Sequence, residues 1–370
     1  MKLVIFGLTI SSSWGNGHAT IWRGLCRALA RRNYRIVFFE RDVPYYAAHR
    51  DLYEVPGGKL VLFSDWTAIH AAAEREISDA DVAIVTSYCP DGVAASELVL
   101  GSPAVRVFYD LDTPVTLEQI EQEKSVGYIG PRGLADFDLV LSYTGGRALR
   151  ELMDRLGARR VAPLYGSVDA DVHRPCAPLE PYRAELSYIG TYASDRQSAL
   201  QKFFLEPARR LPEKRFLIAG AQYPPDFPWR KNLFFVQHIP PPDHAALYCS
   251  SRLTLNLTRS AMARMGYCPS GRLFEAAACA TPILSDGWEG LEHFFEPGRE
   301  LLLAQRTEDV LGALSLTDDE LQRISRRARA RTLEQHTAER RAWEFEEILA
   351  HTARWRSETA QSCLLTCSEV

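Results

Sequence analysis

The 370-residue sequence has no strong excess of charge and no long apolar run. Its 43 basic and 47 acidic side chains give a formal net charge of −4, which excludes a global attraction to nucleic acid or acidic lipid. No stretch approaches the roughly 18 consecutive apolar residues of a membrane-spanning helix. The hydrophobic fraction of 46% is that of a folded globular chain, so disorder and coiled-coil arrays are excluded as the main architecture.

The eight cysteines lack the spacing of a zinc site or a disulfide framework. They are scattered along the chain, and several stand in apolar patterns where a free thiol behaves as a small hydrophobe. The only close pair, Cys363 and Cys367, has no second pair of ligands nearby. The first apolar run, residues 3–6, is too short for a secretion signal and is expected to be a strand. We therefore expect a reduced, cytoplasmic protein without a metal site.

Two common nucleotide-binding signatures are also missing. Thr20 stands where the third glycine of a dinucleotide fingerprint beginning at Gly15 would be, which disfavours an NAD-dependent oxidoreductase. No phosphate loop ending in Gly-Lys-Ser or Gly-Lys-Thr occurs, so ATP hydrolysis by that route is disfavoured as well.

What the sequence contains is a series of short apolar runs that alternate with helical patterns. This alternation predicts an α/β fold of parallel strands with crossover helices. A polar segment that includes Pro175, Pro178 and Pro181 interrupts the series and suits a linker. We expect two Rossmann-like domains, residues 1–170 and 171–340, followed by a helix and tail at 341–370 that can pack back on the first domain. The expected strands are 2–7, 35–40, 60–63, 82–87, 105–110, 139–143, 161–164, 186–190, 216–220, 233–237, 253–257 and 282–285.

A glycine-rich loop with Gly15 and Gly17 joins the first strand to its helix. Such a loop leaves backbone amides free at the helix N-terminus and lets a ligand approach the main chain closely. His18 stands at the mouth of this loop, where an imidazole could accept a proton from an attacking hydroxyl or bind a sugar. The alternative is a histidine that caps or packs against the helix.

Asp110 and Asp112 follow a predicted strand with the spacing of a metal-binding carboxylate pair. We interpret them instead as polar residues that line a ligand site at the strand end.

The second domain repeats the arrangement of a strand end followed by a helix. Gly190 and Thr191 end a predicted strand, and Arg196 stands where a guanidinium could hold a diphosphate through two hydrogen bonds. The alternative is that the polar residues before Arg196 only cap the helix.

Residues 264–286 are the most informative segment. A Pro-Ser-Gly turn opens a small-residue helix, so the amides near Ser270 and Gly271, together with Arg272, could hold phosphate. Glu275 follows one turn later, where its carboxylate could accept hydrogen bonds from two ribose hydroxyls.

The sequence resembles the GT-B glycosyltransferases, specifically their spore-maturation-protein-like branch with a carboxy-terminal glycosyltransferase domain. The matching residues are 272–282, 285–286, 288–291 and 296–300, and the likeness extends over nearly the whole chain, including residues 14–18 and 110–114. It implies two Rossmann-like domains that face each other across a cleft. The second domain would bind the nucleotide sugar, and the first would bind the acceptor.

The resemblance also implies roles for single residues. Glu275 is similar in position to the carboxylate that binds the nucleotide ribose, and His238 lies in the region that contacts the base. The expected diphosphate site consists of Gly190, Thr191, Arg196, Ser270, Gly271 and Arg272, and Gly15 and Gly17 are also expected to contact the donor. The expected catalytic residues are His18 and Asp112.

Tyr267 is a departure from the pattern, because the large retaining GT-B family has a second glutamate eight positions before the ribose carboxylate. Inversion would follow if His18 acts as the base, and retention if the donor phosphate takes the acceptor proton. The stereochemical outcome stays open.

The resulting hypothesis is a hexosyltransferase that moves a sugar from a nucleoside diphosphate sugar to an acceptor hydroxyl, with no cofactor and no metal. The alternatives are a non-hydrolysing sugar-nucleotide epimerase and a catalytically silent nucleotide-sugar-binding protein. The acceptor is a small molecule, a glycan or a protein; a nucleic acid is not expected, and peripheral membrane contact is left open.

Overall fold

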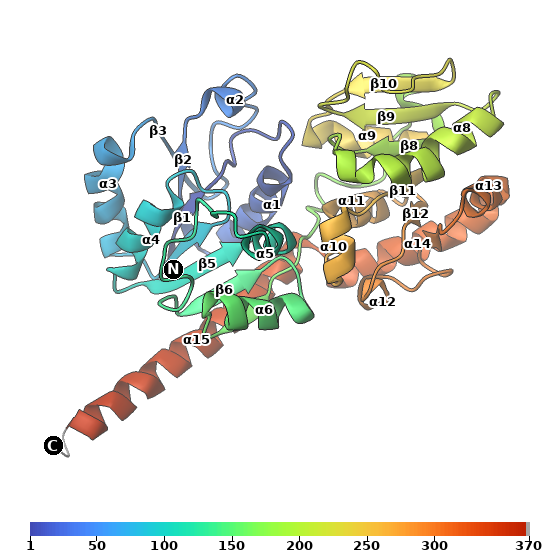
Figure 1. The fold of residues 1–370 in the computed structure, drawn as a ribbon. Coiled ribbons are helices and arrows are strands. Elements are labelled where there is room, and N and C mark those ends of the chain that lie inside the picture. Colours follow the sequence, from blue (N-terminus) through green and yellow to red (C-terminus); the bar gives the residue numbers. More distant parts are fainter. Residues whose placement is uncertain (368–370) are drawn as a thin grey trace. The chain divides into compact units, whose positions relative to one another are not determined.

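The computed structural model describes residues 1–367, with the side chains of residue 357 and of residues 359–367 left out. Cys363 and Cys367 therefore lie outside the described side chains. The chain divides into two compact units (Figure 1). One unit contains Met1–Ser11, Leu25–Tyr165 and the chain from Glu339 onward, and the other contains Ser12–Gly24 and Gly166–Ala338.

The first unit is built on a seven-stranded parallel sheet. Its strand order is β3-β2-β1-β4-β5-β6-β7, so the order reverses between β1 and β4, as in a Rossmann fold. β1 and β4 are buried along their whole length, which is why they appear in the sequence as continuous apolar runs. The strands are β1 (Lys2–Gly7), β2 (Arg35–Arg41), β3 (Gly58–Phe63), β4 (Val82–Thr86), β5 (Val105–Asp110), β6 (Leu139–Ser142) and β7 (Val161–Pro163).

Helices connect these strands in alternation. Side chains from the sheet and from α3 and α4 share one buried cluster that includes Phe6, Phe39, Ala73 and Val99. The helices are α1 (Gly17–Arg31), α2 (Pro44–Ala47), α3 (Trp66–Ser78), α4 (Gly92–Leu100), α5 (Thr113–Glu121) and α6 (Arg147–Leu156).

The second unit has a six-stranded parallel sheet of the same kind. Its order is β10-β9-β8-β11-β12-β13, with the reversal between β8 and β11. Its strands are β8 (Ala184–Ile189), β9 (Phe216–Gly220), β10 (Leu233–Gln237), β11 (Ser251–Asn256), β12 (Ile283–Ser285) and β13 (Leu302–Leu303). The predicted α/β class with two series of parallel strands is confirmed.

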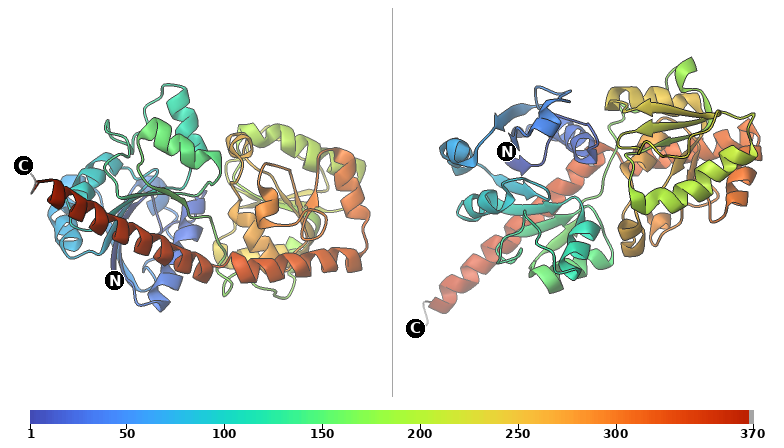
Figure 2. Two further views of the ribbon diagram at one scale, coloured as in Figure 1. Left: turned by 90° about the horizontal axis from the view of Figure 1, so that it is seen from below. Right: turned by 45° about the horizontal axis from the view of Figure 1, so that its top comes forward.

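Helices cover both faces of the second sheet (Figure 2). Phe204 and Phe216 pack edge to face in its core, with ring centroids 5.6 Å apart. The longer helices are α9 (Pro241–Ser250), α11 (Gly271–Ala278), α13 (Thr307–Ser315) and α14 (Asp318–Gln335). The shorter ones are η1 (Glu180–Tyr182), η2 (Ser194–Arg196), α7 (Gln197–Leu200), η3 (Gln201–Leu205), α8 (Glu206–Arg210), α10 (Ser260–Met265) and α12 (Leu291–Phe294).

The long helix α15 (Ala338–Cys367) runs along the first unit (Figure 2). Arg341 donates to the Tyr165 carbonyl at 3.2 Å, and Arg356 donates to the Ala104 carbonyl at 2.9 Å. Arg31 and Glu339 form an ion pair at 2.6 Å. Within the described residues, no helix combines the length and the apolar character that crossing a membrane requires.

Candidate functional site

The carboxyl ends of β8 and β11 are the centre of the candidate site, because parallel sheets of this type bind ligands where the strand order reverses. Arg272 on α11 donates from Nη1 to the Ile189 carbonyl at 2.6 Å and from Nη2 to the Leu257 carbonyl at 2.9 Å. These carbonyls lie at the ends of the two strands. Arg272 therefore holds the strand ends together and brings a positive charge between them.

Gly190 leaves the room that this guanidinium needs. A Cβ at position 190 would lie 2.8 Å from Arg272 Nη1 and 2.7 Å from the Tyr188 hydroxyl oxygen. A Cβ on Gly220, at the end of the neighbouring β9, would lie 2.0 Å from the Gly190 carbonyl oxygen. A larger residue at position 190 would therefore displace the side chains of Tyr188 and Arg272, and a larger residue at position 220 would displace the backbone of Gly190.

Arg196 brings a second guanidinium to the end of β8. Its side chain is 8% exposed, and its Nη2 donates to the Thr191 carbonyl. Among the described residues, the buried Nε of Arg196 has no hydrogen-bond partner. Burial lowers the pKa of Arg196, and the nearby charge of Arg272 lowers it further. Within the described part of the chain, no carboxylate forms a hydrogen bond or an ion pair with either guanidinium, so their positive charge is available to an anion.

The N-terminus of α11 adds backbone donors to this region. Ser270 precedes the helix with an extended backbone, and its hydroxyl accepts a hydrogen bond from Arg272 Nε at 2.9 Å instead of capping the helix. The first amides of α11, beginning at Gly271, therefore have no side-chain cap. Uncapped amides at a helix N-terminus bind the oxygens of phosphate groups.

Glu275 lies one turn into α11 and is 6% exposed. Its Oε2 accepts from the Tyr248 hydroxyl at 3.3 Å and lies 3.4 Å from His244 Nδ1. Burial raises the pKa of Glu275, but His173 and His244 outweigh it and lower the pKa to about 2. The ideal Cβ position of Gly271 is 4.0 Å from Oε1, and no hydrogen bond to this oxygen occurs within the described residues. Glu275 therefore presents one free, ionised oxygen beside the amides of α11.

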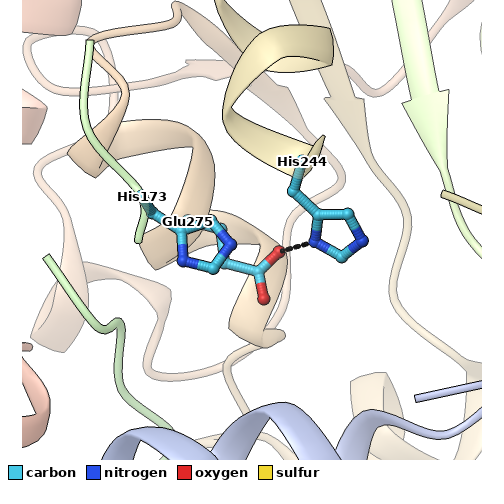
Figure 3. A group of neighbouring side chains, drawn as sticks. All are labelled: His173, His244 and Glu275. Atoms are coloured by element: carbon cyan, nitrogen blue, oxygen red, sulfur yellow. Dashed lines mark ion pairs between the residues drawn. The ribbon is translucent and has the colours of Figure 1, made fainter. Parts of the chain in front are cut away.

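The structure adds two histidines that sequence reasoning missed. His173 lies in the loop before η1, and His244 lies on α9; Figure 3 shows both rings converging on the Glu275 carboxylate. Burial lowers the pKa of His173, whereas contact with Glu275 raises that of His244 in spite of its burial. No spacing in the sequence relates these two residues to Glu275, and His173 falls in the segment that was predicted to be a linker.

His238 and Tyr267 both have positive φ angles, of 58° and 45°. His238 follows β10, and its amide donates to the Gly220 carbonyl at 3.3 Å, so the structure places it two strands from β8. Its role in contacting a base stays a prediction. The Tyr267 ring packs against Gly290, whose Cβ, if present, would lie 2.6 Å from Tyr267 Cδ1. Tyr267 therefore packs closely against the backbone at Gly290, and whether it replaces a glutamate stays a prediction.

The other predicted residues lie at the loop before α1 and at the start of α5. Gly15 has a φ of 59°, and His18, 9% exposed, donates from its amide to Asn16 Oδ1 at 3.0 Å. Gly17 begins α1 and has no neighbour within 4 Å of its Cβ position. Asp112 precedes α5 and is half-buried. The catalytic roles of His18 and Asp112 stay predictions.

A family model described as glycosyl transferase-like matches residues 196–347, which include α11 and most of the second sheet. The match covers less than half of the chain and lies mainly in the second unit. Of the residues predicted for donor binding, the matched range contains Arg196, His238, Ser270, Gly271, Arg272 and Glu275. No curated protein matches the sequence.

Solved structures extend the likeness to both units. Sucrose-phosphate synthase from Thermosynechococcus elongatus is similar with a TM-score of 0.70 at 12% identity, over 95% of this chain and 98% of that chain. Anabaena HepE, in complex with UDP and glucose, has a TM-score of 0.67 at 12% identity, over 95% and 100%. The T4 phage protein BGT, in complex with its UDP-glucose substrate, has a TM-score of 0.58 at 13% identity, over 94% and 99%. The chain thus has the two-sheet α/β architecture of GT-B glycosyltransferases.

Proposed function

We propose that this protein is a glycosyltransferase that moves a hexose from a nucleoside diphosphate sugar to an acceptor hydroxyl. One observation carries the proposal: the guanidinium groups of Arg196 and Arg272 meet at the end of β8, and no carboxylate among the described residues forms a hydrogen bond or an ion pair with either of them. Two guanidinium groups, that of Arg196 buried and that of Arg272 half-buried, beside an uncapped helix N-terminus favour a ligand with two adjacent negative groups.

The same groups would assist the reaction. As the bond between sugar and diphosphate breaks, negative charge accumulates on the leaving diphosphate. Arg196 and the first amides of α11 would stabilise that charge with donors that are already oriented. Arg272 donates one hydrogen bond each to Ile189, Leu257 and Ser270, and it would act mainly through its charge and by holding the strand ends in place. This arrangement needs no cation on the diphosphate.

Glu275 would position the nucleotide. Its free Oε1 can accept a hydrogen bond from a ribose hydroxyl, and its ionised state makes that bond a strong one. The acceptor side of the reaction rests on His18 and Asp112 as sequence predictions. Membership of the spore-maturation-protein-like branch and a cytoplasmic location are likewise proposals.

UDP-glucose is the first donor to test, because it is the ligand named for structures of both HepE and BGT. The purified full-length protein should bind UDP and should release UDP from UDP-glucose faster when a suitable acceptor is present. Formation of a new sugar nucleotide from the donor alone would identify an epimerase instead. The proposal would be overturned if the protein bound none of UDP, GDP, ADP and dTDP.

Variants of Arg196 and Glu275 test the site itself. Arg196→Lys keeps a charge but removes the planar fork, and Glu275→Gln keeps the shape but removes the charge. A hydrogen bond to a charged group contributes about 1.5–3 kcal/mol, so each variant should weaken nucleotide binding by roughly tenfold to 150-fold. Arg323→Ala, an exposed change on α14, is the matched control and should bind as wild type does. Wild-type affinity in both site variants would show that the nucleotide binds elsewhere.

A further inference from the structure

His173, His244 and Glu275 form a buried cluster that the proposed transfer reaction does not fully use (Figure 3). One ring nitrogen from each histidine and one oxygen from Glu275 all lie within 4.8 Å of one another. The three residues come from a loop, from α9 and from α11, so the fold of the second unit brings them together.

His173 is the most unusual member of the cluster. It is 1% exposed, and neither Nδ1 nor Nε2 has a hydrogen-bond partner in the part of the chain that the structure describes. Burying polar atoms without partners is unfavourable, and nearly all buried polar groups in proteins are hydrogen-bonded. An imidazole in this state is suited to a ligand that accepts its lone pair of electrons.

The surroundings of His244 determine which of its nitrogens faces the cluster. Its Nε2 lies 3.0 Å from the Ile239 carbonyl, which can only accept, so Nε2 carries a hydrogen. Nδ1 then points at Glu275 Oε2, 3.4 Å away. A histidine that binds a metal through one nitrogen almost always donates from the other to a carbonyl or carboxylate, which is the arrangement seen here.

Glu275 has matching support. The Tyr248 hydroxyl donates to Oε2 at 3.3 Å, and carboxylates that bind metals are commonly held by such a second hydrogen bond.

We propose that His173, His244 and Glu275 bind a single divalent transition-metal ion of the zinc class. Two imidazoles and one carboxylate are a known zinc ligand set, whereas Mg²⁺ and Ca²⁺ prefer oxygen ligands alone. Zinc bonds of about 2.0–2.1 Å in a tetrahedron place ligand atoms about 3.3 Å apart. The separation of 3.4 Å between His244 Nδ1 and Glu275 Oε2 agrees with that spacing. Three protein ligands leave the fourth position open to water.

This site does not depend on the proposed transfer reaction. The metal would use Glu275 Oε2, on the side of Tyr248 and His244, whereas the ribose would use Oε1, near Gly271. One carboxylate can serve both ligands, because its two oxygens face different neighbours. The alternative without a metal is an ion pair between a protonated His244 and Glu275, with His173 as a bystander.

The test measures zinc binding by the full-length protein after treatment with a chelator and removal of that chelator. Titration calorimetry with ZnCl₂ should give one site per chain. Co²⁺ in place of zinc should give the intense visible bands of a tetrahedral centre. His173→Ala and Glu275→Gln should each weaken zinc binding by more than about a hundredfold, since loss of a supporting group alone weakens metal binding by about tenfold to a hundredfold. Tyr248→Phe, which removes only a supporting group, should weaken zinc binding by about tenfold to a hundredfold.

Two controls separate this site from other ligands of the chain. His70→Ala, an exposed change on α3, should bind zinc as wild type does. Cys249→Ser tests the thiol on α9, which accepts from the Cys176 amide at 3.3 Å, and should also leave zinc binding intact. Unfolding curves for every variant identify any that has lost its structure.

Three results would overturn the inference: no zinc binding by wild type, equal zinc binding by wild type and both ligand variants, or loss of binding in Cys249→Ser alone. Zinc and UDP are titrated separately, so the two proposals fail independently. A protein that binds zinc without binding UDP would keep this site and lose the proposed function. A protein that binds UDP without binding zinc would keep the proposed function and lose this site.

Discussion

Asp110, at the end of β5, is a buried carboxyl whose ionisation should control the stability of the first unit near neutral pH. The residue is 0% exposed. Its Oδ1 accepts from the Asp112 amide at 3.0 Å, whereas Oδ2 has no hydrogen-bond partner among the described residues. Burial raises the pKa of Asp110 from 3.8 to about 7 and the Asp112 carboxylate adds to the increase, whereas the Asp112 amide and the nearby hydroxyls of Thr116 and Ser87 oppose it.

The direction in which pH changes the stability depends on whether the folded or the unfolded chain binds the proton of Asp110 more tightly. Between pH 4 and pH 7 the folded protein holds a proton on Asp110 that the unfolded chain has lost. The free energy of unfolding therefore falls as pH rises through this range and levels off above pH 7. One pKa unit corresponds to about 1.4 kcal/mol, so a shift of about three units amounts to a loss on the order of 4 kcal/mol.

Asp110→Asn removes the ionisation while it keeps the shape of the side chain. The amide of the variant lowers the free energy of unfolding by a constant amount, because the new donor at the Oδ2 position has no acceptor. This cost does not depend on pH. The free energy of unfolding of the variant relative to wild type should therefore rise by about 4 kcal/mol from pH 4 to pH 7.5. Urea unfolding at half-unit pH steps measures this difference, monitored by a spectroscopic signal that reports on the first unit.

Asp154→Asn on α6 is the matched control, because Asp154 is exposed in the same unit. It should follow the wild-type curve at every pH. A difference between Asp110→Asn and wild type that stays constant from pH 4 to pH 7.5 would refute the reasoning, since it would mean that the buried carboxyl ionises as an exposed one does.

Three further changes test contacts in the second unit by thermal or urea unfolding. Arg272→Met removes the donors that join Ile189 and Leu257, so it should cost at least about 3 kcal/mol and also weaken UDP binding. Gly220→Ala should lower the melting temperature by several degrees, because its Cβ would meet a backbone oxygen at 2.0 Å. Asn232→Ala loses three hydrogen bonds of 2.9–3.1 Å to backbone carbonyls and should cost about 1–3 kcal/mol.

Most strands were predictable because fully buried parallel strands consist of uninterrupted apolar residues. β1, β5, β9 and β10 have the predicted limits, and the other predicted strands differ by one or two residues at an end. The strand β13 was missed, since a run of two leucines gives no periodic signal. The order of the strands in each sheet, with its reversal beside the first strand, is a property of tertiary packing that no local pattern contains.

The sequence groups the residues proposed for donor binding only where they stand in one local motif. Ser270, Gly271, Arg272 and Glu275 belong to a single turn and helix, so the sequence places them together. The use of Arg272 as a clamp on two strand ends was not foreseeable, because its partners come from distant parts of the chain.

The same limit explains why His173 was missed. Prolines around it indicate a linker, and a linker is expected to be solvated. The segment instead turns into the second unit, where His173 is buried beside Glu275.

Glu275 connects the two proposals, and its two oxygens explain how. A buried carboxylate with both oxygens free would bind a proton at neutral pH, because burial penalises its charge. Here one oxygen is occupied by Tyr248 and lies close to His244, which keeps the group ionised. The other oxygen can then bind a hydroxyl as a full negative charge. The histidine cluster is therefore what makes Glu275 a strong acceptor for a ribose, whether a proton on His244 or a metal ion supplies the balancing charge.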